Sequence, residues 1–147
     1  MSQLALASMI LTRAAFQTLS RARRREARVL LDANLPAGAF YLTGYSIECA
    51  LKACIARGTE RYTFPDRDRA NDSHTHDLTQ LLRSAGLQTA FDQAGKASQV
   101  LARNWAIVKD WKVTSRYDGT IDMKKARALY KAATGRNGVL AWLRQNW

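Results

Sequence analysis

The chain has 147 residues, of which 23 are Lys or Arg and 12 are Asp or Glu, so its formal charge is +11 at pH 7. A chain of this length is expected to form one domain with its own hydrophobic core. Its hydrophobic content of 47% argues against intrinsic disorder. No run of about 18 uncharged apolar residues occurs, which argues against a membrane-spanning helix. The strong positive charge favours anionic partners, with nucleic acid first.

The N-terminal segment is apolar from Leu4 to Leu11, and no acidic residue precedes Glu26. A secretory signal would place its positive charges before the apolar run, whereas Arg13 and Arg21 follow it. An organellar transit peptide and a plain amphipathic helix both fit this pattern. We expect a cytoplasmic protein.

The two cysteines, Cys49 and Cys54, are separated by four residues within one apolar stretch. No second cluster of ligands completes a zinc site or a disulfide framework. We therefore expect buried thiols, no metal and no cofactor.

The composition predicts an all-helical fold. The chain contains 24 Ala and 17 Leu but only 5 Ile and 5 Val, a mixture that favours helices over strands. The first helix is expected either over 3–18 or as one longer helix that continues through 20–33. Pro36 ends the longer form. The second is expected over 37–57, with Gly58 as its C-terminal stop. Because this second helix is apolar on more than one side, we place it at the centre of the bundle.

The rest of the chain predicts shorter elements. A polar connection over 58–75 leads to a third helix, which is capped near Asp77 and ends at Gly86. The fourth helix is expected over Thr89–Val108, with Val100, Leu101 and Trp105 among its core residues. An irregular segment follows over Lys109–Thr120. The last helix begins at Asp122 and is weakened at Gly135 and Gly138. Together these elements form an up-and-down bundle of about five helices.

The stretch 37–53 reads AGAFYLTGYSIECALKA. It resembles the signature helix of the HEPN family, the higher eukaryote and prokaryote nucleotide-binding domains, whose small bacterial members have the pattern a-Y-x-x-G-Y-x-x-E-x-x-L-K-a. Further matches follow the same order in the chain: Glu26-Ala27, His76-Asp77-Leu78, Trp111 and Arg116-Tyr117. We expect one HEPN-like domain over 1–147, with residues 1–20 as an N-terminal helical extension outside the resemblance.

The signature residues also have physical roles of their own, at Gly44, Tyr45, Glu48 and Lys52. Gly44 allows a close contact to this helix, which would offset its propensity cost of about 1 kcal/mol. Glu48 precedes Lys52 by four residues, the favourable order for a helical ion pair. Because Glu48 lies on a largely apolar helix, its charge needs a partner, and we expect a structural ion pair or a cap to a neighbouring helix.

The resemblance implies a helical bundle that dimerises through its longer helices and handles nucleotides or RNA in a groove at the dimer interface. Many members are metal-independent ribonucleases in which four to six residues separate an Arg from a following His. The His would act as general base on a ribose 2′-hydroxyl, while the Arg neutralises the phosphate. The resemblance also implies a companion protein, either a nucleotidyltransferase or a toxin–antitoxin partner.

This chain departs from that pattern after Arg116, which occupies the position of the motif arginine. No histidine occurs over 117–123. The literal spacing is found instead between Arg69 and either His74 or His76, in the long connection. Arg116 is therefore a tentative catalytic residue that lacks the general base of the motif. His74 or His76 would be a general base at a displaced position.

Basic residues form two groups. Arg21, Arg24, Arg25 and Arg28 share one helical face at 100° per residue, which fits either a solvated surface or phosphate binding. The second group is scattered over the last helix: Lys124, Lys125, Arg127, Lys131, Arg136 and Arg144. In the irregular segment, Trp111 and Tyr117 are candidates to stack on bases beside Arg116.

We therefore predict a homodimeric protein that binds a nucleotide or RNA through Arg116, Tyr117 and neighbouring basic residues without hydrolysis. Two alternatives remain open. One is a metal-independent endoribonuclease with a displaced or substituted base, and the other is a protein-interaction module whose basic stripe meets an acidic partner.

Overall fold

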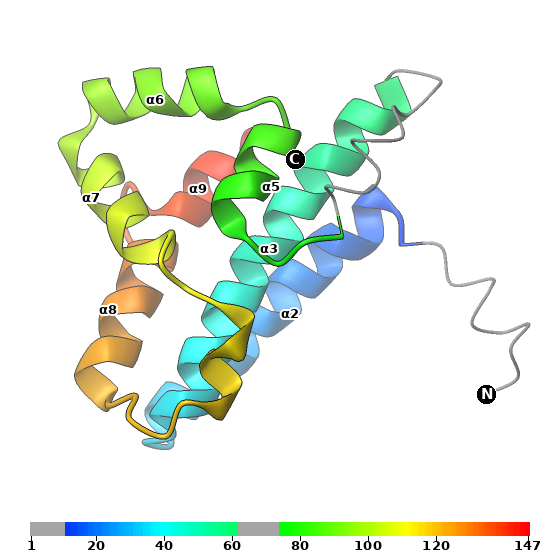
Figure 1. Cartoon of the computed structure of the whole chain (residues 1–147). Helices are drawn as coiled ribbons and strands as arrows, with labels where there is room; N and C mark the ends of the chain where they lie inside the picture. The colour runs from blue at the N-terminus through cyan, green and yellow to red at the C-terminus, as the bar shows by residue number, and fades with distance from the viewer. Residues whose placement is uncertain (1–10, 62–73) are drawn as a thin grey trace, which may run out of the picture.

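The computed structural model describes residues 11–61 and 74–147 (Figure 1). Within these ranges all regular structure is helical and no β-strand occurs, as the composition predicts. In chain order the elements are α2 (Arg13–Asp32), α3 (Pro36–Arg61), α5 (Leu78–Ser84), α6 (Gln88–Ala97), α7 (Gln99–Val108), the 3-10 helix η1 (Val113–Tyr117), α8 (Met123–Thr134) and α9 (Val139–Arg144). None of the described helices is long and apolar enough to cross a membrane.

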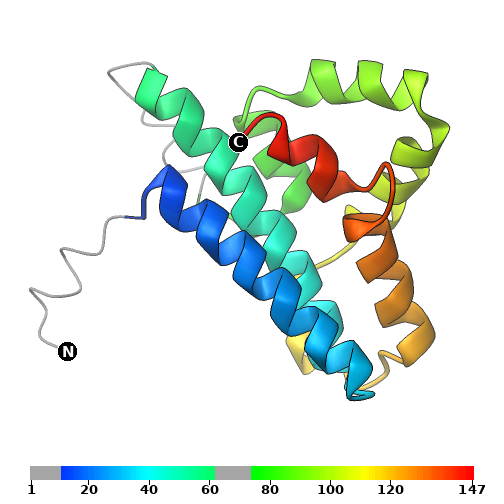
Figure 2. The ribbon, with the colours of Figure 1, turned by 180° about the vertical axis from the view of Figure 1, so that it is seen from behind.

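Helices α2 and α3 form a long antiparallel hairpin (Figures 1 and 2). They approach closely because small residues meet between them: the Ser20 hydroxyl donates a 2.7 Å hydrogen bond to the carbonyl of Ser46, and both residues are buried. The hairpin turns at Asn34, whose φ of 60° lies in the left-handed region. The first helix thus follows the longer of its two predicted forms from Arg13 onward, and residues 1–10 lie outside the described part.

The prediction that the second helix stops at Gly58 is wrong, since α3 continues to Arg61. The Thr59 hydroxyl donates to the carbonyl of Ile55 at 3.1 Å, within the continuing helix. A glycine in a helix costs only about 1 kcal/mol, which the rest of a long packed helix can offset. Helix α3 is indeed central, because it contacts α2, α5, η1, α8 and α9.

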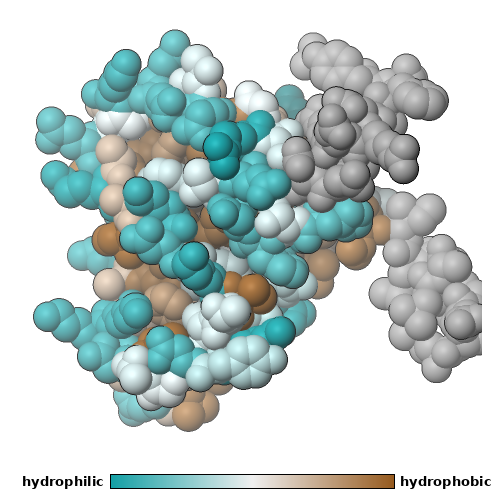
Figure 3. Space-filling model, viewed as in Figure 1, coloured by the Kyte–Doolittle hydropathy of each residue, from teal (hydrophilic) through white to brown (hydrophobic). Residues whose placement is uncertain are grey.

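The predicted fourth helix is broken into α6 and α7 at Ser98. This residue is extended, with φ −131° and ψ 102°, and its hydroxyl accepts a hydrogen bond from the amide of Leu101, as an N-cap does. The new helix buries Leu101 but leaves Val100 39% exposed, so the prediction of Val100 as a core residue is wrong. Figure 3 shows apolar atoms along α7 and α8 at the left edge of an otherwise mostly hydrophilic face.

The last predicted helix begins where expected. The Asp122 carboxylate accepts from the amide of Lys125 at 2.8 Å and caps α8. The weak point at the two glycines is a complete break, after which α9 begins at Val139. A Cβ atom at Gly138 would lie 2.7 Å from the carbonyl oxygens of Ala133 and Gly135, so the tight turn between the helices needs this glycine.

The closest approach to α3 occurs at Gly44. The indole of Trp111, at the start of the segment that leads into η1, lies directly against this glycine, and a Cβ atom there would be 2.1 to 2.2 Å from three ring atoms. Trp111 is only 3% exposed. The prediction that Trp111 stacks on bases is therefore wrong: its ring is part of the core, and the predicted close contact at Gly44 is made with this ring.

We expect Gly44→Ala to lower the free energy of unfolding by about 1 to 3 kcal/mol, because the new methyl group overlaps an indole that packing holds in place. Urea denaturation followed by circular dichroism measures this. The matched control is Gly95→Ala in α6, where the new Cβ would meet Ala102 at an ordinary 3.6 Å. Alanine there should be neutral or stabilising by up to about 1 kcal/mol. Equal effects of the two substitutions would contradict the assignment of Gly44.

Candidate functional site

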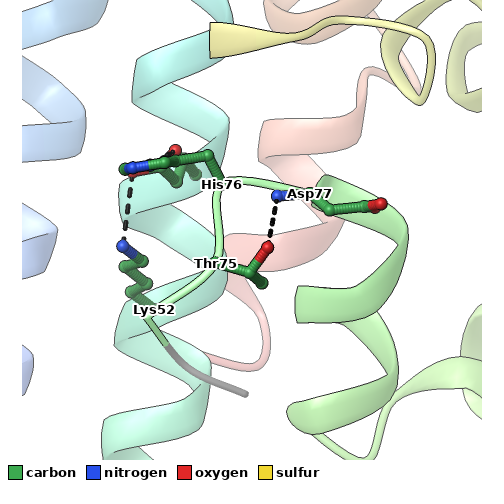
Figure 4. A network of polar contacts seen from close by, with 5 residues as sticks. Lys52, Thr75, His76 and Asp77 are labelled. Atoms are coloured by element: carbon green, nitrogen blue, oxygen red, sulfur yellow. Dashed lines mark hydrogen bonds and ion pairs between the residues drawn. The ribbon is translucent and has the colours of Figure 1, made fainter. Parts of the chain in front are cut away.

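One candidate site surrounds the carboxylate of Glu48, which is 2% exposed in the middle of α3. One carboxylate oxygen lies 2.8 Å from Nδ1 of His76, and the other lies 3.4 Å from Nζ of Lys52 (Figure 4). The predicted ion pair between Glu48 and Lys52 is therefore present. Because an ionised carboxylate can only accept hydrogen bonds, Nδ1 of His76 is the donor.

The contact with His76 ties the segment before α5 to α3. The next residue, Asp77, is the N-cap of α5, as predicted, and accepts from the amide of Gln80 at 3.1 Å. The hydroxyl of Thr75 accepts from the amide of Asp77 (Figure 4). The imidazole itself remains half exposed, whereas His74 is exposed and lies outside this network. Both histidines were candidate bases, and only His76 is oriented by a carboxylate.

The second candidate site is Arg116 with Tyr117, at the end of η1. The Arg116 guanidinium lies 4.9 Å from the centre of the Tyr117 ring, a cation–π contact, and Tyr117 is 78% exposed. A cleft of about 450 Å³ lies nearby between α3, α7, η1 and α8, but neither Arg116 nor Tyr117 lines it. These two residues are thus displayed on the surface rather than gathered in a pocket.

The arginines of α2 separate into two flanks. Arg28 faces α8 across a cleft of about 480 Å³, whose other cations are Arg127 and Lys131. Further along α2, Arg24 and Arg21 lie close to Arg144 of α9. Arg25 instead lines an apolar groove with Val29 on the outer face of α2 and α3. The predicted stripe therefore does not act as one surface.

We use the name basic groove for two sets of cations that adjoin along α2: those that line the cleft between α2 and α8, and those that lie near Arg144 of α9. Its cations are Arg21, Arg24, Arg28, Arg127, Lys131 and Arg144. Burial lowers the pKa of Arg144, and the neighbouring guanidinium groups of Arg24 and Arg21 lower it further. Arg28 pairs with Asp32 at 3.3 Å, but among the described residues none of the other five forms an ion pair. The groove thus concentrates uncompensated positive charge.

Sequence reasoning missed this convergence. It treated the basic residues of the last helix as a scattered second surface, whereas three of them, Arg127, Lys131 and Arg144, lie toward α2. The available signal was the spacing of Arg127, Tyr130 and Lys131, which share one face of α8. The predicted partner Arg116 lies elsewhere, because η1 packs against α3 on the side away from α2 (Figures 1 and 2).

The described residues contain no group of three potential metal ligands. Arg69 and the acidic residues of the long connection lie outside the described part. Both cysteines are buried, and burial raises the pKa of the thiols of Cys49 and Cys54 to about 12. They are therefore neutral at physiological pH and poor nucleophiles.

In comparisons with known proteins, no protein-family model, no curated protein and no solved structure matches the chain. The resemblance to HEPN domains therefore depends on the signature residues themselves.

We expect Glu48→Gln to lower the free energy of unfolding by about 1 to 3 kcal/mol, because it weakens two charge-assisted contacts of a buried group. The control is Glu26→Gln, which removes an exposed carboxylate that lies 3.3 Å from Arg23 and should change stability by less than about 1 kcal/mol. Thermal and urea unfolding measure both variants. If Glu48→Gln changed the free energy of unfolding as little as the control does, the contacts of Glu48 with His76 and Lys52 would not stabilise the fold.

Proposed function

We propose that the chain binds the phosphate groups of a nucleotide or of RNA in the basic groove, without hydrolysing them. The observation that supports this is the convergence of cations from α2, α8 and α9, five of which have no ion-pair partner among the described residues. Like charges this close repel one another in the free protein. A bound polyanion relieves the repulsion, and its release of condensed counterions adds to the affinity.

The chemistry of the groove favours phosphate over other anions. Five of its six cations are arginines, and the planar guanidinium fork matches two oxygens of a phosphate. Arg116 and Tyr117, on the other side of α3, are better suited to a secondary contact, with an exposed cation and an exposed ring.

The absence of hydrolysis is proposed from the sequence and the arrangement of the candidate bases. No histidine follows Arg116 in the chain, and both histidines belong to the segment before α5. The observation that favours a ribonuclease instead is the contact between Glu48 and Nδ1 of His76, since a carboxylate at Nδ1 orients the other ring nitrogen as a base.

We further propose that the chain is a HEPN-like protein that acts with a nucleotidyltransferase or an antitoxin. The support is that the signature residues have distinct structural roles on the central helix. Gly44 admits Trp111, and Glu48 binds both Lys52 and His76. These are the residues through which the chain resembles the family.

Homodimerisation is proposed through the outer face of α2 and α3. Val29 is 66% exposed there, and with Leu30 and Leu42 it lines a mostly apolar groove of about 420 Å³. Arg25 and Glu26 border the same groove, so two copies related by a two-fold axis can place the cation of one against the anion of the other.

We expect the protein to bind short single-stranded RNA with an affinity that falls steeply between about 50 and 200 mM salt. Arg144→Gln should weaken binding several-fold and reduce the slope of log K against log salt by about 0.7, the value for one phosphate contact on a single strand. Fluorescence anisotropy with labelled RNA in EDTA measures both quantities.

The control for this experiment is Arg83→Gln on α5, which removes the same charge from a helix that contributes no residue to the groove and should leave the slope unchanged. Absence of RNA affinity at low salt would contradict the proposal and favour a protein-interaction module. Cleavage of the RNA that disappears in His76→Gln but persists in His74→Gln would contradict the absence of hydrolysis.

We expect Val29→Asp to convert a dimer into a monomer in light scattering coupled to gel filtration, because the new carboxylate would be buried against an apolar face. Since Val29 is already exposed in the protomer, its fold should be retained, and circular dichroism checks this. Ile107→Asp, at an exposed apolar residue of α7, is the control and should remain dimeric. A monomeric wild-type protein would exclude this interface.

A further inference from the structure

The cleft of the basic groove between α2 and α8 is a pocket next to the turn between α2 and α3. Two helices face one another across it, and each contributes three residues at positions i, i+3 and i+4. These residues are Arg28, Leu31 and Asp32 of α2, and Arg127, Tyr130 and Lys131 of α8. Asn34, the left-handed residue of the turn, also lines the pocket and borders it on that side. We call this cavity of about 480 Å³ the end pocket.

We propose that the end pocket binds the terminal phosphate and terminal nucleotide of an RNA strand, so that the protein recognises a phosphorylated end. This inference deepens the proposed function and rests on it. Along the rest of the groove, Arg21, Arg24 and Arg144 would hold the internal phosphates, which carry no information about the end.

The charge of the pocket fits a terminal phosphate better than an internal one. Three cations surround the cavity, and a single carboxylate, Asp32, offsets only one of them through its pair with Arg28. The two cations of α8 are therefore left to the ligand. A phosphomonoester carries a charge of about −1.5 to −2 at pH 7, whereas an internal diester carries only about −1.

The shape and lining of the pocket fit the nucleotide that carries this phosphate. The volume lies in the range of about 300 to 1,000 Å³ that is typical of small-molecule sites. Leu31 is 6% exposed and forms an apolar wall, and Tyr130 is partly buried beside it. A phenol ring in this position offers a surface for base stacking that does not depend on sequence. The side chain of Asn34 supplies an amide for hydrogen bonding.

The test compares three RNAs of one short sequence that end in a 5′-phosphate, in a 3′-phosphate or in hydroxyl groups only. We expect one phosphorylated RNA to bind about tenfold more tightly than the unphosphorylated one, as one or two additional charge-assisted contacts would give. Which phosphorylated RNA is preferred identifies the polarity of the strand. The preference should shrink as the pH falls below about 6, where the phosphomonoester loses its second charge.

Substitutions separate the pocket from the rest of the groove. Arg127→Gln and Lys131→Gln should weaken binding of the phosphorylated RNA by a larger factor than binding of the unphosphorylated RNA, and so remove the preference for the phosphorylated end. Lys124→Gln, an exposed α8 lysine that does not line the pocket, should keep the preference. Arg144→Gln should weaken all three RNAs equally. Equal affinity of wild-type protein for the three RNAs would overturn this inference alone, whereas no affinity for any RNA would overturn the proposed function as well.

Discussion

The contact between Trp111 and Gly44 constrains much of the molecule. It sets how closely the segment leading to η1 approaches α3, and Arg116 and Tyr117 at the end of η1 lie on the surface. About one turn further along α3, Glu48 binds His76 and fixes the entry to α5. Core packing and a buried ion pair thus occupy this side of α3. Among the described residues, the cations that converge without ion-pair partners therefore lie on the other side of the hairpin, along α2.

The central position of α3 has an electrostatic consequence. Because this helix is surrounded on most sides, most of the charged residues of the chain lie on other elements, and Glu48 and Lys52 of α3 form an ion pair. Arg24 and Arg144, from distant parts of the sequence, come close enough for their mutual repulsion to contribute to the lowered pKa of Arg144. Such repulsion disfavours the folded state, so a sequence selected only for stability would have little reason to keep it. A ligand that needs these charges is the simpler explanation.

Local chemistry was enough to predict many features. Asp77 and Asp122 cap their helices because a carboxylate satisfies free amides at a helix start, and Glu48 meets Lys52 because they lie four residues apart. Features that depend on packing between distant segments could not be predicted in this way. The burial of Trp111 requires η1 to lie on α3, and the basic groove requires α8 to lie beside α2. The spacing of Arg127, Tyr130 and Lys131 shows that they share one face of α8, but no periodicity within a single segment shows which other helix that face meets.

In a dimer formed through the apolar face of α2, the basic grooves would not lie at the interface, where the resemblance implies that the binding groove lies. Arg25 and Val29 border the apolar face proposed for a second copy, whereas Arg28 points to α8 and the basic groove. Because these flanks lie on different sides of one helix, a dimer formed through the apolar face would place the two grooves on its outside rather than at the interface. Each protomer would then bind its own strand, and the affinity for one strand would not depend on dimerisation. The affinity for a polyanion long enough to reach both grooves would depend on dimerisation, because binding in one groove raises the effective concentration of the polyanion at the other.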